Sequence, residues 1–128
     1  GLLKEAEKFQ QRFKKYRYEL DHLIQEIITK RKTIAIWGAG SFGITIMSLF
    51  QSLSKNLATI VDRDYRKHGL TFLNFDSIVR PPEYLIDHPV DYIIVCSQYS
   101  SEIIEDIRMK YSLSATIVSL TPRIEIIK

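Results

Sequence analysis

Apolar residues recur at helical spacing through the first quarter of the chain. Residues 2–30 contain no glycine or proline and are rich in Lys, Glu, Gln, Leu and Ile, a composition that favours helix. The apolar positions follow at alternating intervals of four and three residues, and they are Leu2, Ala6, Phe9, Phe13, Tyr16, Leu20, Leu23 and Ile27. This heptad seam predicts one helix about 45 Å long, longer than a domain of this size is wide. We therefore expect part of the seam to pack on a second copy of the chain or on a neighbouring domain.

After residue 32 the pattern changes to short β-rich apolar runs that alternate with helical segments. Strands are predicted at residues 33–37, 56–62, 90–96 and 115–120, with 124–127 as an edge strand or the start of a further element. Helices are predicted at residues 41–53, from 81 to 86 and from 100 to 109, the last capped by Ser100 or Ser101. Residues 63–80 read as loop, with one short extended piece at 70–75.

Strands that alternate with helices indicate a parallel sheet with right-handed crossovers. The predicted fold class is therefore α/β, a three-layer Rossmann-like parallel sheet of about four or five strands with a long N-terminal helix. We divide the chain into a linker or packing helix, residues 1–32, and a nucleotide-binding-type domain, residues 33–128.

Composition limits the class of protein. The chain has 128 residues, 45% apolar and 26% charged, which fits one globular domain and excludes a disordered or fibrous protein. It has no apolar run of the length that a membrane span needs, and its first residues are charged too early for a secretory signal. We expect part of a larger cytoplasmic chain.

The net charge of +3 belongs to the N-terminal helix, since residues 1–32 carry +4 and the rest −1. Acids are interleaved and no aromatic platform accompanies the bases, so a solvated helix face is favoured over nucleic-acid binding.

Cys96 stands alone within an apolar run, which excludes a disulfide framework and a cysteine zinc site. The three histidines, His22, His68 and His88, have no metal-binding spacing, and no metal is expected.

One motif carries chemistry. Between the first predicted strand and its helix stands G-x-G-x-x-G, formed by Gly38, Ala39, Gly40, Ser41, Phe42 and Gly43. An acid, Asp62, ends the next strand 19 residues beyond Gly43, close to the spacing of dinucleotide-binding loops. The first glycine would allow the turn, the second the approach of a pyrophosphate and the third close packing of the helix. The helix N-terminus would attract an anion, and Asp62 would accept from ribose hydroxyls.

Further polar residues follow neighbouring strands at the same edge of the sheet. Arg63 either binds a phosphate or faces water, and Ser97 and Gln98 would line the crevice with the glycine loop. The polar cluster at residues 64–68 either contacts a ligand or is plain loop. The sequence contains no recognisable catalytic constellation. Alternatively, the glycines serve only the turn and packing, and the loop binds nothing.

Four stretches carry a resemblance that spans nearly the whole chain. They are Ile-Trp-Gly-Ala-Gly-Ser-Phe-Gly at 36–43, Ile-Val-Asp-Arg-Asp-Tyr-Arg-Lys-His-Gly at 60–69, Pro-Glu-Tyr-Leu at 82–85 with Asp-Tyr-Ile-Ile-Val at 91–95, and Ser-Glu-Ile at 101–103. In this order they resemble the C-terminal Rossmann-like domain of SAM-dependent C-methyltransferases that act on nucleotide-linked deoxysugars. The second stretch, similar to that family's VVD-(R/N)-N-P-x-K-x-G segment, is the most specific.

The resemblance implies a non-catalytic domain that helps to hold a nucleotide-sugar. In that family SAM and the catalytic residues lie in a central domain. A helix that residues 2–30 resemble links this central domain to the C-terminal domain. The chain departs from the family at Phe42, where a lysine commonly stands nearby, at residues 73–75 in place of Pro-Gly, and at residues 97–99 in place of Pro-Trp. These departures bear on ligand identity more than on fold.

Three other functions remain open from the sequence. The chain could be a stand-alone Rossmann module for a dinucleotide or nucleotide-sugar, or a fragment of an NAD-dependent sugar oxidoreductase or epimerase, with NAD(P) as the ligand. It could also be a structural or oligomerisation module with an empty loop. The expected partners are a nucleotide-linked sugar or a dinucleotide, together with the rest of the parent polypeptide or a second copy through the N-terminal helix; no membrane is expected.

Overall fold

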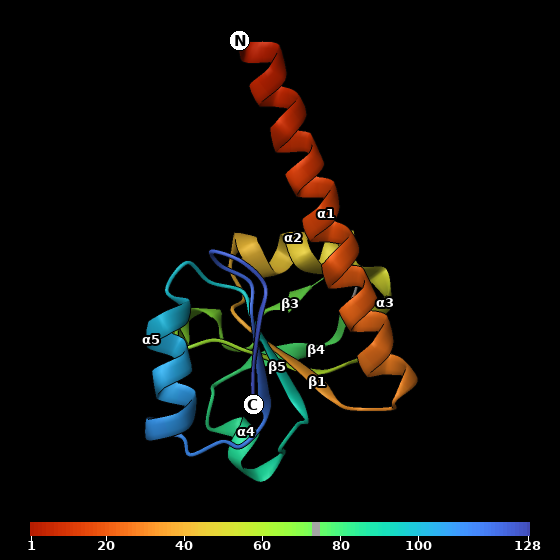
Figure 1. Ribbon diagram of the computed structural model, residues 1–128. Coiled ribbons are helices and arrows are strands. Elements are labelled where there is room, and N and C mark those ends of the chain that lie inside the picture. The colour runs from red at the N-terminus through yellow and green to blue at the C-terminus, as the bar shows by residue number, and fades with distance from the viewer. Residues whose placement is uncertain (73–74) are drawn as a thin grey trace.

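A single long helix begins the computed structural model, which describes residues 1–72 and 75–128 and all side chains within them except that of Phe9. Helix α1 runs over Leu2–Thr29, and its first half stands away from the rest of the molecule (Figure 1). Its second half packs on the sheet, where Leu20, Ile24 and Ile27 are buried. The predicted long helix is thus present, and its seam is shared between the domain and open space.

Seven strands form one sheet in the order β3-β4-β2-β1-β5-β6-β7. The strands are β1 (Ile34–Trp37), β2 (Leu57–Val61), β3 (Thr71–Phe72), β4 (Phe75–Arg80), β5 (Tyr92–Val95), β6 (Thr116–Ser119) and β7 (Glu125–Ile127). The five inner strands are parallel, and the edge strands β3 and β7 are antiparallel to their neighbours. From β1 the chain forms β2, β3 and β4 on one side of β1, and then β5, β6 and β7 on the other side. The strand order therefore reverses beside β1. This reversal is where open α/β sheets bind ligands.

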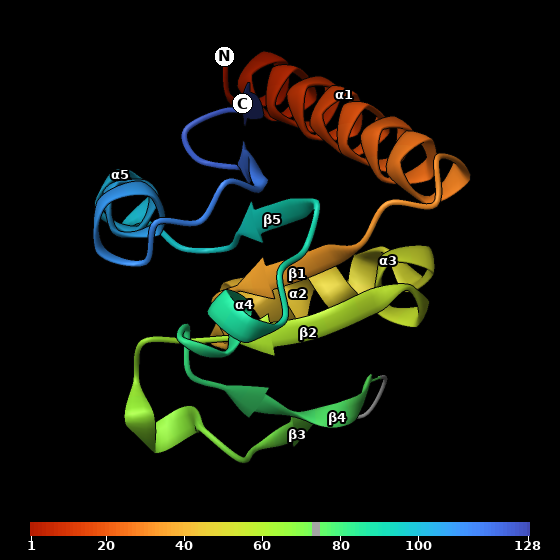
Figure 2. The ribbon, with the colours of Figure 1, turned by 90° about the horizontal axis from the view of Figure 1, so that it is seen from below.

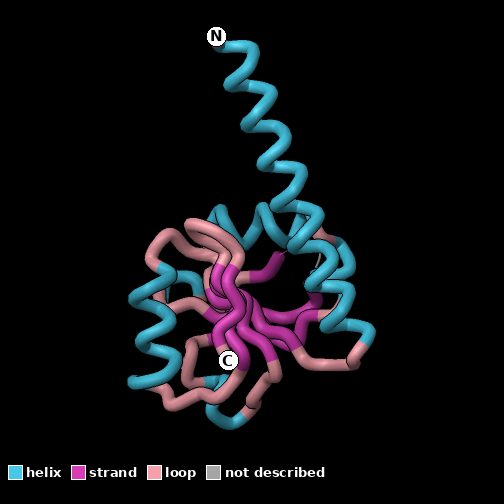
Figure 3. The backbone as a smooth tube through the Cα atoms, in the orientation of Figure 1, coloured by secondary structure: helices cyan, strands magenta, loops and turns pink. Residues whose placement is uncertain are grey.

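Helices cover both faces of the sheet (Figures 2 and 3). On one face α1 packs with α2 (Ser41–Leu49) and α3 (Gln51–Lys55). On the other lie α4 (Tyr84–Asp87) and α5 (Ser100–Glu105), which continues as the π-helical turn η2 (Asp106–Lys110). The short 3-10 helix η1 (Tyr65–Lys67) follows β2. The three-layer α/β fold is confirmed.

Alternate side chains of the central strand face the two helical layers. Ile34 and Ile36 of β1 belong to the core beneath α1 and α2, whereas Ala35 and Trp37 belong to the core beneath α5. Because successive side chains of a strand point to opposite faces, a central strand covered on both sides must be apolar throughout. All four residues of β1 are buried, which fixes the start of the following glycine loop against a rigid core.

Two predicted boundaries are corrected by the structure. Residues 63–80, expected to be mostly loop, include β4, and only Val79 of that strand is buried; the apolar signal was too weak to predict a strand. Part of the extended piece expected at 70–75 lies outside the described residues, as do 73–74 of the family comparison. The helix expected at 41–53 divides at Phe50, whose turn buries both Phe50 and Leu53.

The edge strand expected near the C-terminus is present as β7. None of the helices in the described ranges is long and apolar enough to cross a membrane.

Candidate functional site

A cavity of about 510 Å³ opens at the carboxyl ends of β1, β2 and β5. Eight of the ten predicted site residues line it, namely Gly38, Gly40, Ser41, Phe42, Asp62, Arg63, Ser97 and Gln98. Ala39 and Gly43 lie behind this wall and are buried. A larger hollow of about 740 Å³ between α2, α3 and β3 contains none of these residues and lies away from the end of the sheet where ligands bind.

The three loop glycines occupy three different environments. Gly38 has φ +125°, and a Cβ there would collide with the carbonyl oxygen of Cys96. A Cβ on Gly43 would collide with the carbonyl oxygen of Gly38, so α2 can approach the strand only through glycine. A Cβ on Gly40 would meet only the Lys67 side chain, 3.0 Å from Nζ. Of the three glycines, Gly40 is therefore the one whose Cβ position is open toward the cavity.

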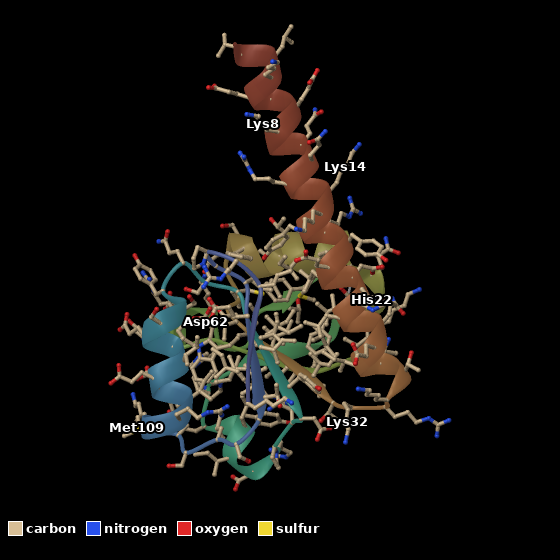
Figure 4. All side chains as sticks on the ribbon, viewed as in Figure 1. Lys8, Lys14, His22, Lys32, Asp62 and Met109 are labelled. Carbon is tan, nitrogen blue, oxygen red and sulfur yellow. The ribbon has the colours of Figure 1, made fainter. Side chains whose placement is uncertain are left out.

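Asp62 holds the glycine loop from beneath. Its Oδ2 accepts a hydrogen bond of 2.7 Å from the Ala39 amide, and its Oδ1 accepts one of 2.8 Å from the Asp64 amide. Figure 4 labels Asp62 between the sheet and α5. The sequence predicted this carboxylate as an acceptor for ribose hydroxyls; in the structure both of its oxygens are engaged by the backbone.

The segment after Asp62 is a compact turn made by its own side chains. Asp64 caps η1 by accepting from the Arg66 amide at 3.0 Å, and the Arg66 guanidinium pairs with both of its oxygens. This pairing lowers the pKa of Asp64 to about 2. His68 Nε2 lies 2.7 Å from the Asp62 carbonyl oxygen, which can only accept, so Nε2 carries the proton.

The turn places Lys67 over the glycine loop. Lys67 is half-buried, its side chain lines the cavity, and no carboxylate in the described ranges forms an ion pair with it. Lys67 belongs to the polar cluster at residues 64–68, for which the sequence predicts either a ligand contact or a plain loop, and it is not among the predicted site residues. Its signal was the lysine of the family-like segment at residues 60–69, five residues after Asp62.

Arg63 has two partners that neither sequence alternative included. Its Nη1 lies 3.2 Å from Glu102 Oε1 and 3.3 Å from Asp106 Oδ2. Both carboxylates belong to α5 and η2, so Arg63 ties the end of β2 to the helix that covers that face. Its charge is neutralised by the protein although the residue lines the cavity.

The loop after β5 closes the opposite wall. Ser97 Oγ accepts from the Tyr99 amide at 3.0 Å, and the Ser97 carbonyl accepts from Thr121 Oγ1 at 3.0 Å. Ser100 does not cap α5, because Tyr99 occupies the cap position; instead Ser100 Oγ donates to the Thr121 carbonyl at 3.1 Å. Gln98 and Tyr99 remain exposed at the cavity rim.

Two buried groups line the cavity floor. Burial raises the pKa of the Cys96 thiol, which therefore stays protonated. Trp37 is 1% exposed, and its Nε1 has no hydrogen-bond partner within the described part of the chain. In the sequence, Trp37 ends the first predicted strand and belongs to the family-like stretch at 36–43, but it is not among the predicted site residues. Among the residues described, no cluster of His, Cys, Asp or Glu is placed to hold a metal ion.

Solved structures with a similar fold are known. The chain is 21% identical to the UDP-D-quinovosamine 4-dehydrogenase from Vibrio fischeri, with a TM-score of 0.52 over 72% of this chain and 79% of that one. It is 25% identical to RSP in complex with β-NADH, with a TM-score of 0.54 over 82% of this chain and 54% of that one. A second structure of RSP, described as a Rex-family repressor, is 22% identical, with a TM-score of 0.52 over 83% of this chain and 55% of that one.

The chain thus spans most of the dehydrogenase chain but only about half of each RSP chain. These similarities agree with the Rossmann-type order of the inner strands. No curated protein matches the chain significantly. Residues 3–122 match the family model described as the C-methyltransferase C-terminal domain. Because this match covers nearly all of the sheet and its helices, the chain belongs to the C-methyltransferase C-terminal domain family.

Proposed function

We propose that this chain is an accessory domain of a SAM-dependent sugar C-methyltransferase and binds the diphosphate of a nucleotide-linked sugar at the glycine loop. The observation that carries the proposal is the Lys67 ammonium against the open face of Gly40. A cation beside backbone amides at a helix N-terminus is suited to a phosphate.

The start of α2 supplies the amides. The Ile44 amide bonds to the Gly40 carbonyl, and no described side chain caps the helix at Gly40. The amides that precede Ile44 at a helix start have no partner within the helix. Because Gly40 has no side chain, a phosphate oxygen can reach them from the cavity. The helix dipole adds a favourable field of the same sign as Lys67.

The groups around this cavity are suited to binding rather than to bond making. The Cys96 thiol stays protonated, the Ser97 hydroxyl accepts from a backbone amide, and Arg63 is paired with two carboxylates. We place SAM and methyl transfer in another domain of the parent polypeptide, as the family resemblance implies. In this proposal the chain contributes affinity and orientation of the nucleotide-sugar.

A dinucleotide is the second candidate ligand. The similarity to the RSP complex with β-NADH covers 82% of this chain at 25% identity, and the glycine loop has the G-x-G-x-x-G spacing of such sites. Both candidates contain a diphosphate, so they share the loop and differ in what is attached to it.

Calorimetric titration of the chain with UDP-glucose, dTDP-glucose, NAD, NADP and SAM tests the proposal. We expect binding of the nucleotide-sugars, with at least ten-fold weaker binding in Lys67→Gln and none in Gly40→Val. Lys55→Gln, which removes an exposed lysine at the end of α3, is the matched control and should bind normally. Binding of NAD alone would favour the dinucleotide module, and binding unaffected by both loop variants would refute the site.

A further inference from the structure

Every polar group of Asp62 is engaged within the protein. Its amide donates to the Arg80 carbonyl at 3.1 Å, and its carbonyl accepts from His68 Nε2 at 2.7 Å. Its two carboxylate oxygens accept from the Ala39 and Asp64 amides at 2.7 and 2.8 Å. In doubly wound sheets an acid at this position normally accepts from the ribose 2′-hydroxyl. Here the same carboxylate joins the glycine loop to the turn that carries Lys67.

We infer that Asp62 is a positioning residue that clamps the glycine loop, and that the site recognises its nucleotide by the diphosphate without selecting ribose over 2′-deoxyribose. This inference rests on the proposed function. It adds a ligand class, since nucleoside diphosphates and 2′-deoxynucleoside diphosphates should bind alike.

The first step of the argument concerns the cost of a ribose contact. A hydroxyl donor that approached Asp62 would share or replace one of two short charge-assisted bonds from backbone amides. Loss of either bond would leave a partly buried amide without a partner, which is unfavourable. Each oxygen has a second lone pair, so a 2′-hydroxyl that shares it meets an acceptor whose charge is already divided with an amide, and one that displaces an amide loses what it gains. We therefore expect the 2′-hydroxyl to add little affinity.

The second step concerns the other charges at the end of β2. Arg63 is paired with Glu102 and Asp106, and Arg66 is paired with Asp64. Within the described residues, Lys67 is the cation of this segment that has no ion-pair partner, and its Nζ lies over Gly40. The unpaired charge thus lies beside the glycine loop, where the proposed function places the diphosphate.

The third step links the clamp to Lys67. Asp62 Oδ1 holds the Asp64 amide, Asp64 caps η1, and the Lys67 amide bonds to the Asp64 carbonyl at 2.9 Å. Removal of the Asp62 charge should therefore weaken diphosphate binding by displacing both the loop and Lys67. It should do so equally for ribo- and deoxyribonucleotides.

Titration of the unmodified chain with UDP, dUDP and UMP tests the inference, because UDP and dUDP differ only at the 2′-hydroxyl. We expect the dissociation constants of UDP and dUDP to agree within three-fold, and UMP to bind at least ten-fold more weakly. Asp62→Asn should weaken UDP and dUDP by the same factor, as should Lys67→Gln; Lys55→Gln should change neither.

A preference for UDP over dUDP greater than three-fold would overturn the inference while leaving the proposed function intact. So would an Asp62→Asn variant that weakens UDP alone. Absence of binding by every nucleotide would instead refute the proposed function, and the inference with it. The comparison of UDP with dUDP uses only the native chain, so it holds even if Asp62→Asn fails to fold.

Discussion

The hydroxyl of Tyr16 donates a 2.9 Å hydrogen bond to the backbone carbonyl of Leu120, 104 residues away. Burial raises the pKa of Tyr16 to about 12, and the nearby Cys96 adds a smaller effect in the same direction. The hydroxyl therefore keeps its proton throughout the neutral range. This bond joins α1 to the residue after β6. The described residues of α1 before Tyr16 are exposed, and the first half of the helix stands away from the domain (Figure 1).

Removal of this hydroxyl should destabilise the fold. Tyr16→Phe removes the donor, so the partly buried Leu120 carbonyl loses this hydrogen bond. The loss should cost about 1 kcal/mol of stability. For a domain of this size we expect the melting temperature to fall by roughly 3–5 °C. Tyr18→Phe is the control, because Tyr18 is 72% exposed. Equal melting temperatures of the two variants, measured by calorimetry, would show that the bond contributes nothing.

Two glycines of the loop should lose different amounts of stability on the same substitution. Gly43→Ala places a Cβ against the Gly38 carbonyl oxygen, and such overpacking should cost about 2 kcal/mol or more. Gly40→Ala meets only the flexible end of Lys67, at a φ of −88° that alanine tolerates. We expect its cost to stay within about 1 kcal/mol. Urea unfolding of both variants measures the difference, and equal stabilities would contradict it.

Asp91 should make stability depend on pH in the acid range. Its Oδ2 accepts from the Thr33 amide at 2.8 Å and from Thr33 Oγ1 at 3.0 Å, and the amide bond in particular lowers the pKa of Asp91. A carboxyl with a lowered pKa stabilises the fold above its unfolded pKa of about 3.9, and this stabilisation is lost as the pH falls through the folded value.

Asp91→Asn keeps an oxygen acceptor for Thr33 but removes the charge. We therefore expect its stability to fall less steeply than that of the native chain between pH 5 and 2. At pH 7 the loss should be under about 1 kcal/mol, since Asp91 is exposed and its charge is screened. Melting curves across this range, with the exposed Asp87→Asn as control, test the expectation. Parallel profiles for Asp91→Asn and the native chain would contradict it.

The elements that could be predicted from the sequence are those with strong, local signals. Inner strands such as β1 and β5 are continuous apolar runs, and the glycine loop between β1 and α2 has fixed spacing. β4 could not be predicted, because Asp76 and Ser77 interrupt its apolar pattern. Its place in the sheet depends on pairing with β2, which is distant in sequence.

The candidate site was predictable in position but not in its hydrogen bonding. Spacing placed Asp62 beside the loop, yet side-chain rotation decides whether its carboxylate meets a ligand or the Ala39 amide. The partners of Arg63 lie 39 and 43 residues away, and only the packing of α5 brings them together. Local sequence patterns do not predict such distant ion pairs. The sequence therefore could not show that Arg63 is paired with carboxylates whereas Lys67, among the described residues, is not.

The heptad seam of α1 divides at Tyr16. After it, the seam residues Leu20 and Ile27 are buried in the domain and Leu23 is partly buried, whereas Phe13 is 46% exposed and Leu2 86% exposed. Phe13 lines an apolar groove of about 500 Å³ with residues of α2 and the loop after β6. The projecting half is also basic, as the labelled Lys8 and Lys14 illustrate (Figure 4). We expect this half to be held by another surface, either a second copy or the rest of the parent polypeptide.

Substitutions on the two halves of α1 should therefore have different effects. Leu20→Ala opens a cavity in the core and should cost about 2–5 kcal/mol, which lowers the melting temperature by at least roughly 6 °C. Phe13→Glu should lower the melting temperature of the monomer far less, because Phe13 is 46% exposed and belongs to neither core cluster. Sedimentation then identifies the partner. A native dimer that Phe13→Glu converts to monomer indicates a second copy, whereas a native monomer excludes a second copy. A fall in monomer stability for Phe13→Glu as large as that for Leu20→Ala would show that the projecting half packs within its own domain.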